Sequence, residues 1–213
     1  LLSLLTTLFI GFSIGANVNV ARTLGNQDDQ GTKDGIHTAV SVSILSGSAM
    51  ILLGFLFGRP MLQWMGTPAD VIDKASLYLM IIFIGMPSNM AYNFGSAILR
   101  AMGDTKRPLY FLSAAGVLNV VLNLIFVIVL HMDVAGVALA TILSETLSAV
   151  LILNCLCRTD GPCHLNIRKL YIQKDQLFRM LRIGLPAGIQ SGMFSFSNVL
   201  IQSSINSFGS VVM

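Results

Sequence analysis

Six long apolar stretches restrict the possible folds of this 213-residue chain more than any other feature of its sequence. A helix needs about 20 mainly apolar residues to cross the hydrocarbon core of a bilayer. The polar–apolar alternation of a membrane barrel strand is not seen in these stretches. The expected spans are residues 1–20, 37–58, 75–99, 108–130, 134–157 and 183–211. The sequence therefore predicts an all-α, polytopic transmembrane helix bundle with six visible spans.

The composition agrees with this fold class. Only 11% of the residues are charged and 54% are hydrophobic, whereas soluble domains carry about 25% charged residues. This excludes a cytosolic enzyme, a nucleic-acid-binding module and a disordered regulator. The three cysteines are an odd number and do not indicate a disulfide framework. Because the chain begins and ends within apolar stretches, we expect it to be a piece of a longer protein.

The basic residues are distributed unevenly over the connections between the spans. Eleven of the 13 Lys and Arg residues lie in segments 21–36, 100–107 and 158–182, which belong to one side of the membrane. The other side has only Arg59 and Lys74. The positive-inside rule then places the three basic segments in the cytoplasm. We expect a multi-pass protein of the inner (cytoplasmic) membrane.

The segment 158–182 is the longest and most basic of these connections. Apolar residues alternate with its charges, which is typical of a helix lying on the inner membrane surface. They are Leu170, Tyr171, Leu177, Phe178 and Leu181. The simplest interpretation is a linker between two bundles that prefers anionic lipid.

Polar side chains within the predicted spans indicate either helix packing or a solute path, because burying them in a bilayer is costly. Glu145 is the only acidic residue well inside a predicted span. Asn119 and Asn123 are four residues apart and share a helix face, as do Thr141 and Glu145. The short turn at 131–133 makes the two helices antiparallel neighbours, so the two pairs match in depth. Their oxygens would suit a hard monovalent cation, and the alternative is hydrogen bonding that joins two helices.

A second set of residues is expected to line a substrate cavity. The last predicted span has a polar stripe at helical spacing, which should face protein or a water-filled cavity rather than lipid. A stretch rich in methionine and aromatic residues, 80–92, suits a promiscuous binding surface, with ordinary packing as the alternative. The candidate cavity residues from these two features are Ser191, Ser195, Asn198, Gln202, Met86 and Tyr92.

Enzymatic and metal chemistry is not indicated. A zinc cluster of Cys155, Cys157, Cys163 and His164 is disfavoured, because two residues two positions apart on a helix point in directions about 200° apart. The sequence has no Gly-rich phosphate loop with its Lys and no Ser/His/Asp grouping. We therefore expect no catalytic residues, no metal and no cofactor.

Four motifs resemble those of multidrug and toxic compound extrusion (MATE) transporters. Residues 15–28 (GANVNVARTLGNQD) are similar to the end of the second helix in that family, and residues 99–108 (LRAMGDTKRP) to its "LRA-x-GDT-x-x-P" loop. Residues 135–141 (AGVALAT) and 182–186 (RIGLP) resemble the starts of its sixth and seventh helices. The motifs span nearly the whole chain in the family's order. The resemblance implies that the six spans are the second to the seventh of twelve helices.

The resemblance also implies a domain organisation. Residues 1–157 would form most of the first transmembrane lobe, and residues 158–182 would be the cytoplasmic basic inter-lobe linker. Residues 183–213 would be the truncated first helix of the second lobe. The first helix of the family and most of the second lobe would then lie outside this sequence.

The implied activity is antiport. Such a transporter would export amphipathic, mostly cationic drugs by alternating access, in exchange for sodium or protons. The family's first-lobe cation site combines an Asp on the first helix, absent from this sequence, with polar residues that match Asn119, Asn123 and Thr141. The expected partners are small-molecule cationic drugs, a coupling cation and the lipid bilayer, and not nucleic acid. The alternatives are a flippase for a lipid-linked saccharide and a non-transporting membrane partner protein.

Overall fold

The structure is a computed structural model that describes the backbone of residues 2–64 and 69–206. Some side chains within these ranges are outside the description, at positions 2–5, 8, 61, 64, 69–71, 195–196, 199–200 and 202–206.

Within these ranges the chain forms six α-helices and no strand, which confirms the all-α prediction. One helix occupies each predicted span within the described residues, and each helix extends beyond its span at one or both ends. They are α1 (Leu2–Gly25), α2 (Asp29–Trp64), α3 (Ala69–Ala101), α4 (Lys106–Asn123), α5 (Asp133–Cys157) and α6 (Lys174–Asn206).

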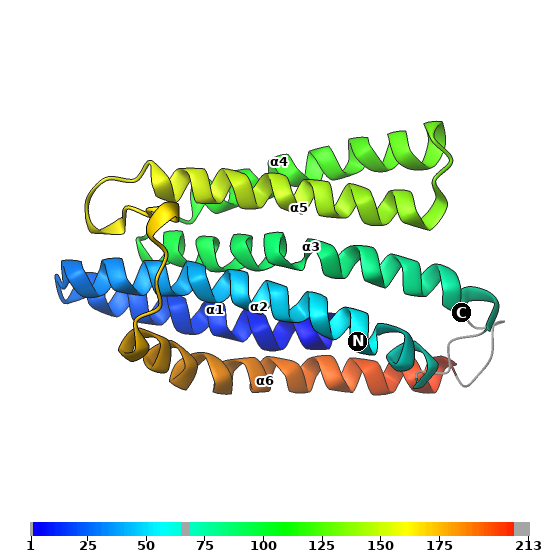
Figure 1. Cartoon of the computed structure of the whole chain (residues 1–213), viewed down its shortest axis with the longest axis horizontal. Coiled ribbons are helices and arrows are strands. Elements are labelled where there is room, and N and C mark those ends of the chain that lie inside the picture. The colour runs from blue at the N-terminus through cyan, green and yellow to red at the C-terminus, as the bar shows by residue number, and fades with distance from the viewer. Residues whose placement is uncertain (1, 65–68, 207–213) are drawn as a thin grey trace.

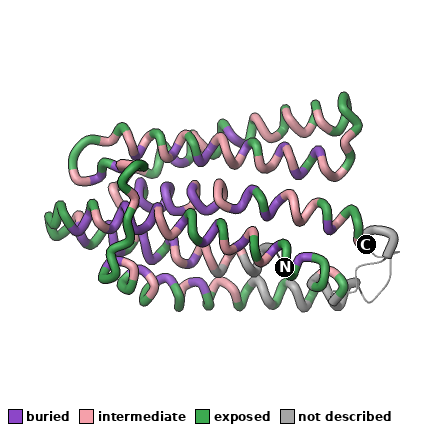
Figure 2. Tube along the Cα trace, in the orientation of Figure 1, coloured by how far each residue is buried: buried purple, intermediate pink, exposed green. Residues whose placement is uncertain are grey.

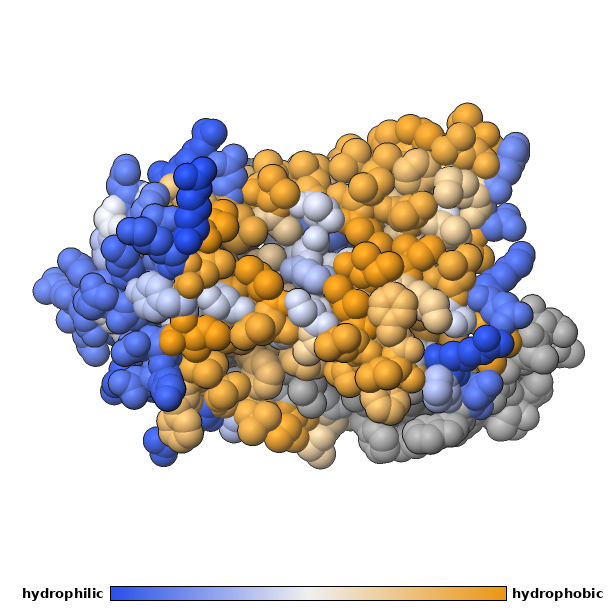
Figure 3. Space-filling view, in the orientation of Figure 1, coloured by the Kyte–Doolittle hydropathy of each residue, from blue (hydrophilic) through white to orange (hydrophobic). Residues whose placement is uncertain are grey.

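The helices run side by side along the long axis of the molecule (Figure 1). The antiparallel pair α4 and α5 lies on one side, α3 is central, and α1 and α2 separate α3 from α6. The connections 26–28, 102–105 and 158–173 all lie at the same end. Hydrophilic residues gather at that end and an apolar band covers the middle of the face in Figure 3. The prediction that the three basic segments share one side is therefore confirmed.

Local sequence explains how two helices begin at this end. The Asp28 carboxylate accepts a 2.8 Å hydrogen bond from the Gly31 amide in the first turn of α2. The Asp104 carboxylate accepts 3.1 Å hydrogen bonds from the amides of Lys106 and Arg107 at the start of α4. Such carboxylates satisfy N–H groups that have no partner within the helix.

The core is concentrated in the half of the bundle nearest to these connections (Figure 2). Its fully buried side chains come from α1, α2, α3 and α5, and include Val20, Ile36, Phe94, Ile98 and Ile152. By contrast, α4 buries few of its residues in this chain. Four described segments are long and apolar enough to cross a membrane, namely Asp29–Pro60, Ile72–Ala101, Lys106–Val129 and Asp133–Cys157.

The linker differs from the sequence-based expectation. Helix α6 begins at Lys174, so the predicted surface helix does not exist as a separate element and residues 174–182 are the first turns of α6. The physical reason is that these turns pack on another helix. Gln176 and Met180 are only 6% and 2% exposed, and the Asn19 amide of α1 donates a 2.7 Å hydrogen bond to Gln176 Oε1.

A second difference is a π-helical segment, η1 (Leu124–Val129), which continues α4 directly after Asn123. The amide of Leu130 donates to the carbonyl of Ile125, five residues earlier, at 3.0 Å. The segment is entirely apolar, so neither a proline nor a glycine indicated the change. Such segments occur frequently at functional sites.

Candidate substrate and cation sites in the membrane

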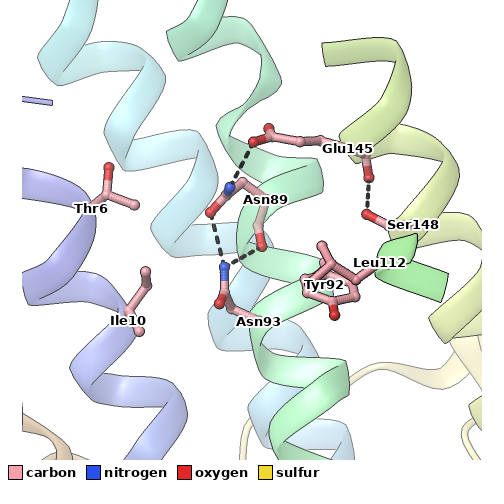
Figure 4. Close-up of a pocket in the computed structure, with 8 residues that line it drawn as sticks. All are labelled: Thr6, Ile10, Asn89, Tyr92, Asn93, Leu112, Glu145 and Ser148. Atoms are coloured by element: carbon pink, nitrogen blue, oxygen red, sulfur yellow. Dashed lines mark hydrogen bonds between the residues drawn. The ribbon is translucent and has the colours of Figure 1, made fainter. Parts of the chain in front are cut away.

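A cavity of about 270 Å³ lies between α1, α3, α4 and α5 at the middle of the bundle. It is flanked by α3, with Asn89, Tyr92 and Asn93, and by α5, with Glu145 (Figure 4). The complete lining is Thr6, Ile10, Asn89, Tyr92, Asn93, Leu112, Glu145 and Ser148. The cavity therefore combines one acidic group with amides, an aromatic ring and two aliphatic side chains.

The acidic group of the cavity is held by a chain of amides. Asn89 Nδ2 donates a 2.9 Å hydrogen bond to Glu145 Oε1. Asn93 Nδ2 in turn donates to the carbonyl and the Oδ1 of Asn89, at 2.9 and 3.0 Å. None of the ion pairs between described residues includes Glu145. Amide contacts orient the carboxyl group and leave its charge available to a cation from outside the protein.

Tyr92 forms an aromatic part of the cavity wall. Its hydroxyl donates a 3.0 Å hydrogen bond to the carbonyl of Pro108 in the first turn of α4. This bond fixes the ring between α3 and α4, with Leu112 one turn further along α4. The ring face is a surface on which an organic cation can stack.

A second polar cluster joins α4 to α5. Asn119 Nδ2 donates a 3.1 Å hydrogen bond to Ser144 Oγ. Asn123 Nδ2 donates to the carbonyl and the Oδ1 of Asn119, at 2.9 and 3.0 Å. The Thr141 hydroxyl donates to the carbonyl of Val137 in its own helix at 2.9 Å. The described contacts of these side chains are thus hydrogen bonds within and between the two helices.

The structure divides the predicted cation cluster into two. Asn119 and Asn123 are together, as expected, and Asn119 contacts Ser144. Glu145 follows Ser144 directly and is therefore turned by about 100° around α5. Its carboxyl group contacts Asn89 of α3 instead of α4. The depth comparison along α4 and α5 predicted how deep these side chains lie in the membrane. It gave no information on contacts with α3.

The predicted substrate-cavity residues are also dispersed. Tyr92 lines the cavity, whereas Met86 is 2% exposed and packs in a hydrophobic cluster with Met50 and Met90. On α6, Ser191 is half-buried and Asn198 is exposed, and the cavity lining includes neither. The side chains of Ser195 and Gln202 are outside the described residues. The described residues of the α6 stripe, Ser191 and Asn198, therefore do not line the Glu145 cavity.

Sequence reasoning missed the residues on α3 that hold Glu145. A signal for them was present, because Asn89 and Asn93 have the same four-residue spacing as the asparagine pair on α4. Ser144 and Ser148, which are buried on α5, were also missed. Polar residues three or four positions apart mark the faces of α3 and α5 that line the cavity, and the faces of α4 and α5 that form the second cluster.

The three cysteines lie at the end of α5 and in the connection that follows it. All three are free, and Cys163 is buried. In the part of the chain that the structure describes, no group of three or more His, Cys, Asp or Glu residues is arranged to hold a metal ion.

Comparison with known proteins places this geometry in a family. A family model described as MatE matches residues 1–125, which is more than half of the chain. The chain belongs to the MatE family. This membership agrees with the four motifs that resemble those of multidrug and toxic compound extrusion transporters.

The curated relatives of this MatE chain are named as multidrug resistance or export proteins. The probable multidrug resistance protein YpnP of Bacillus subtilis (strain 168) is 31% identical over 204 residues, which cover 94% of this chain and 45% of the relative. YoeA of the same strain, also a probable multidrug resistance protein, is 28% identical over 97% of this chain and 46% of its own length. The chain thus spans about half the length of the curated relatives it matches. Their names support a transport protein rather than an enzyme.

Solved structures show the same fold. The inward-facing conformation of a multidrug resistance MATE family transporter of the MOP superfamily superposes with a TM-score of 0.87 at 24% identity, over 95% of this chain and 46% of that one. A MATE crystal structure in the bent conformation gives a TM-score of 0.80 at 26% identity, over 85% of this chain and 41% of that one. The chain is therefore a multi-pass membrane protein with the helix arrangement of MATE transporters.

Proposed function

We propose that the protein to which this MatE chain belongs is a cation-coupled antiporter in the cytoplasmic membrane. It would export amphipathic, mostly cationic drugs in exchange for sodium or protons. The observation that carries the proposal is the cavity in which Glu145, held by Asn89, lies near the ring of Tyr92. A carboxylate and an aromatic face together suit an organic cation with an apolar body.

The lining of the cavity supports this type of ligand, and its size is close to that of a small-molecule pocket. Its volume of about 270 Å³ is slightly below the usual range of small-molecule pockets, about 300–1,000 Å³. The aliphatic groups of Ile10 and Leu112 provide apolar contacts, and the amides of Asn89 and Asn93 provide polar contacts. A site for the pyrophosphate of a lipid-linked saccharide would require Lys or Arg. The cavity lining contains neither. The flippase alternative is therefore not favoured.

We assign the coupling cation to the neighbouring cluster of Asn119, Asn123 and Thr141, together with Glu145. The Asn119 and Thr141 carbonyls accept hydrogen bonds within this cluster, so a cation would have to replace donors there and repack α4 against α5. Glu145 is one residue from Ser144, to which Asn119 donates. A structural change at the α4–α5 contact would therefore displace Glu145 in the adjacent drug cavity.

The mechanism is competition between two states. Cation binding would favour one packing of the first-lobe helices and drug binding would favour the other. Each ligand shifts this equilibrium only to the extent that it binds the two states with different affinity. The net result is exchange of drug for cation across the membrane by alternating access.

The test uses the full-length parent protein in liposomes loaded with ethidium. A sodium gradient and a pH gradient are imposed in separate experiments, and dye movement is followed by fluorescence. Movement driven by either gradient supports the antiporter. Absence of movement under both gradients, with protein that elutes as a single folded species, would contradict it and favour the flippase.

A further inference from the structure

The inter-lobe linker is packed against the first lobe. After α5 it forms two short 3-10 turns, η2 (Gly161–Cys163) and η3 (Ile167–Lys169). The Leu165 amide donates a 3.2 Å hydrogen bond to the carbonyl of Leu156. Cys163 and Leu165 are 5% and 1% exposed and belong to the hydrophobic core. A basic, polar segment is thus attached at its middle to the same core as the helices.

One face of α2 holds the rest of the linker. His37 is 1% exposed, and both of its ring nitrogens have partners. Nε2 lies 3.3 Å from the Asn166 amide nitrogen and Nδ1 lies 2.9 Å from the Lys33 carbonyl. Because the backbone amide can only donate, Nε2 accepts, and the ring proton is on Nδ1 and is donated to Lys33. The imidazole therefore joins the linker to α2.

Tyr171 makes the second attachment. Its ring stacks on His37 with centroids 5.1 Å apart and an interplanar angle of 16°, and its hydroxyl donates a 2.5 Å hydrogen bond to Asp34 Oδ1. The Ser41 hydroxyl lies 3.3 Å from the Tyr171 carbonyl. The Gln173 amide, one residue before α6, donates a 3.0 Å hydrogen bond to Thr38 Oγ1.

These contacts form one unit, which we call the linker clamp. On α2 its residues are spaced at three, four and seven positions from the first, so they share one helix face. On the linker they cover the eight residues before α6. The members are Asp34, His37, Thr38 and Ser41 with Asn166, Tyr171 and Gln173.

The clamp leads directly into the contact between α6 and α1. Asn19 and Gln176 form a buried hydrogen bond within the first turn of α6. Further along, a Cβ on Gly11 would lie 2.2 Å from the Cα of Gly188, and a Cβ on Gly15 would lie 2.1 Å from the Met180 carbonyl oxygen. The two backbones therefore touch, and α6 can separate from α1 only if its first turns move. The linker clamp restrains that movement because it ends one residue before α6.

We propose that the linker clamp holds the first turns of α6 against α1 and that it is released when α6 moves away from α1 during transport. This proposal rests on the proposed function, because it assigns the contact a place in alternating access. Release would expose Cys163, a buried residue of the linker three positions before Asn166 whose side chain packs in the core cluster. The chain thus contains its own reporter for the state of the clamp.

The experiment measures alkylation of Cys163 in the full-length parent protein, in inside-out vesicles with a membrane-impermeant maleimide. Peptide mass spectrometry quantifies modification at this residue and normalises it to the labelling of denatured protein. Tyr171→Phe removes the hydroxyl that contacts Asp34 and keeps the stacked ring. Thr38→Val removes the acceptor of the Gln173 amide at almost constant volume. His164→Phe, at an exposed linker residue outside the clamp, is the matched control.

Each clamp variant should increase the alkylation rate of Cys163 about fivefold, the effect of one lost hydrogen bond. The control should stay within twofold of the wild type. In the wild type, a cation gradient together with ethidium should accelerate alkylation relative to resting vesicles. Equal rates in the clamp variants, the control and the wild type, with ethidium transport intact, would overturn the clamp. Faster alkylation in the variants with no ethidium transport in the wild type would instead overturn the antiporter and, with it, release during transport.

Discussion

Asn89 on α3 donates a 2.9 Å hydrogen bond to Glu145 on α5 and so joins two helices at the wall of a membrane-embedded cavity. This contact places the acidic side chain beside an aromatic ring and two aliphatic groups. It also explains why Glu145 does not join the polar cluster on α4. The proposed drug cavity and the proposed cation cluster are therefore neighbours on α5 that face different helices.

Glu145→Gln should weaken binding of a cationic dye and spare a neutral one. The substitution removes the charge and keeps an oxygen that can accept from Asn89. We expect the Kd of ethidium for the full-length protein to rise about tenfold, or about 1.4 kcal/mol. Fluorescence titration of the purified protein measures this change. Equal weakening of cationic and neutral ligands would indicate a structural role for Glu145.

Asn123→Ala should increase the sodium concentration needed for half-maximal efflux. Its amide holds Asn119 through two hydrogen bonds, so its loss would loosen the proposed cation cluster. We expect a roughly fivefold increase, as for one lost polar contact, with unchanged protein abundance. Asn154→Ala, at an exposed position on α5, is the control. An unchanged sodium dependence would remove Asn123 from the site.

Gly11→Ala should destabilise the protein by impairing the contact between α1 and α6. The new Cβ would lie 2.2 Å from the Cα of Gly188, and overpacking of this kind costs about 1–3 kcal/mol. Gly192→Ala on α6 is the control, because a Cβ there meets nothing within 4 Å. Thermal unfolding in detergent should show a lower Tm for the first variant only. A Tm for Gly11→Ala equal to that of the control would contradict the close backbone contact.

Ionisation of Tyr171 should require unusually high pH. Burial and the adjacent Asp34 carboxylate raise the pKa of Tyr171 to about 12. Because folding raises this pKa, the protonated Tyr171 hydroxyl stabilises the folded state. This contribution to folding stability is complete below the ordinary tyrosine pKa of about 10 and is lost as the pH approaches 12. The difference in tyrosinate absorbance between wild type and Tyr171→Phe should have its midpoint near 12. A midpoint near 10 would show that the hydroxyl is exposed to water and does not contact Asp34.

Much of the fold could be predicted because apolar length alone determines which segments can span a bilayer. Each predicted span is a helix, and the basic connections share one end. The start of α6 could not be predicted in the same way. Lys174 and Arg179 make its first turns polar in composition, but Gln176 and Met180 are buried against α1. Only the tertiary contact shows that these turns belong to the helix.

The contacts of the candidate site residues could be predicted only in part, because they also depend on tertiary packing. Helical periodicity indicated that Asn119 and Asn123 share a face, and the structure agrees. The partner of Glu145 depends on how α3 is rotated against α5. Counting residues along α4 and α5 gives no information on that rotation. Met86 packs in a hydrophobic cluster with Met50 and Met90, because a flexible thioether fills a core as readily as it lines a pocket.

The central claim is that drug and coupling cation compete for this part of the protein. The most direct measurement is the apparent Kd of ethidium for the full-length parent at increasing sodium concentration and, separately, at decreasing pH. The account predicts that the Kd rises with one of these cations and that Glu145→Gln reduces the dependence. A Kd that stays constant over both series, in protein that still transports ethidium, would contradict it.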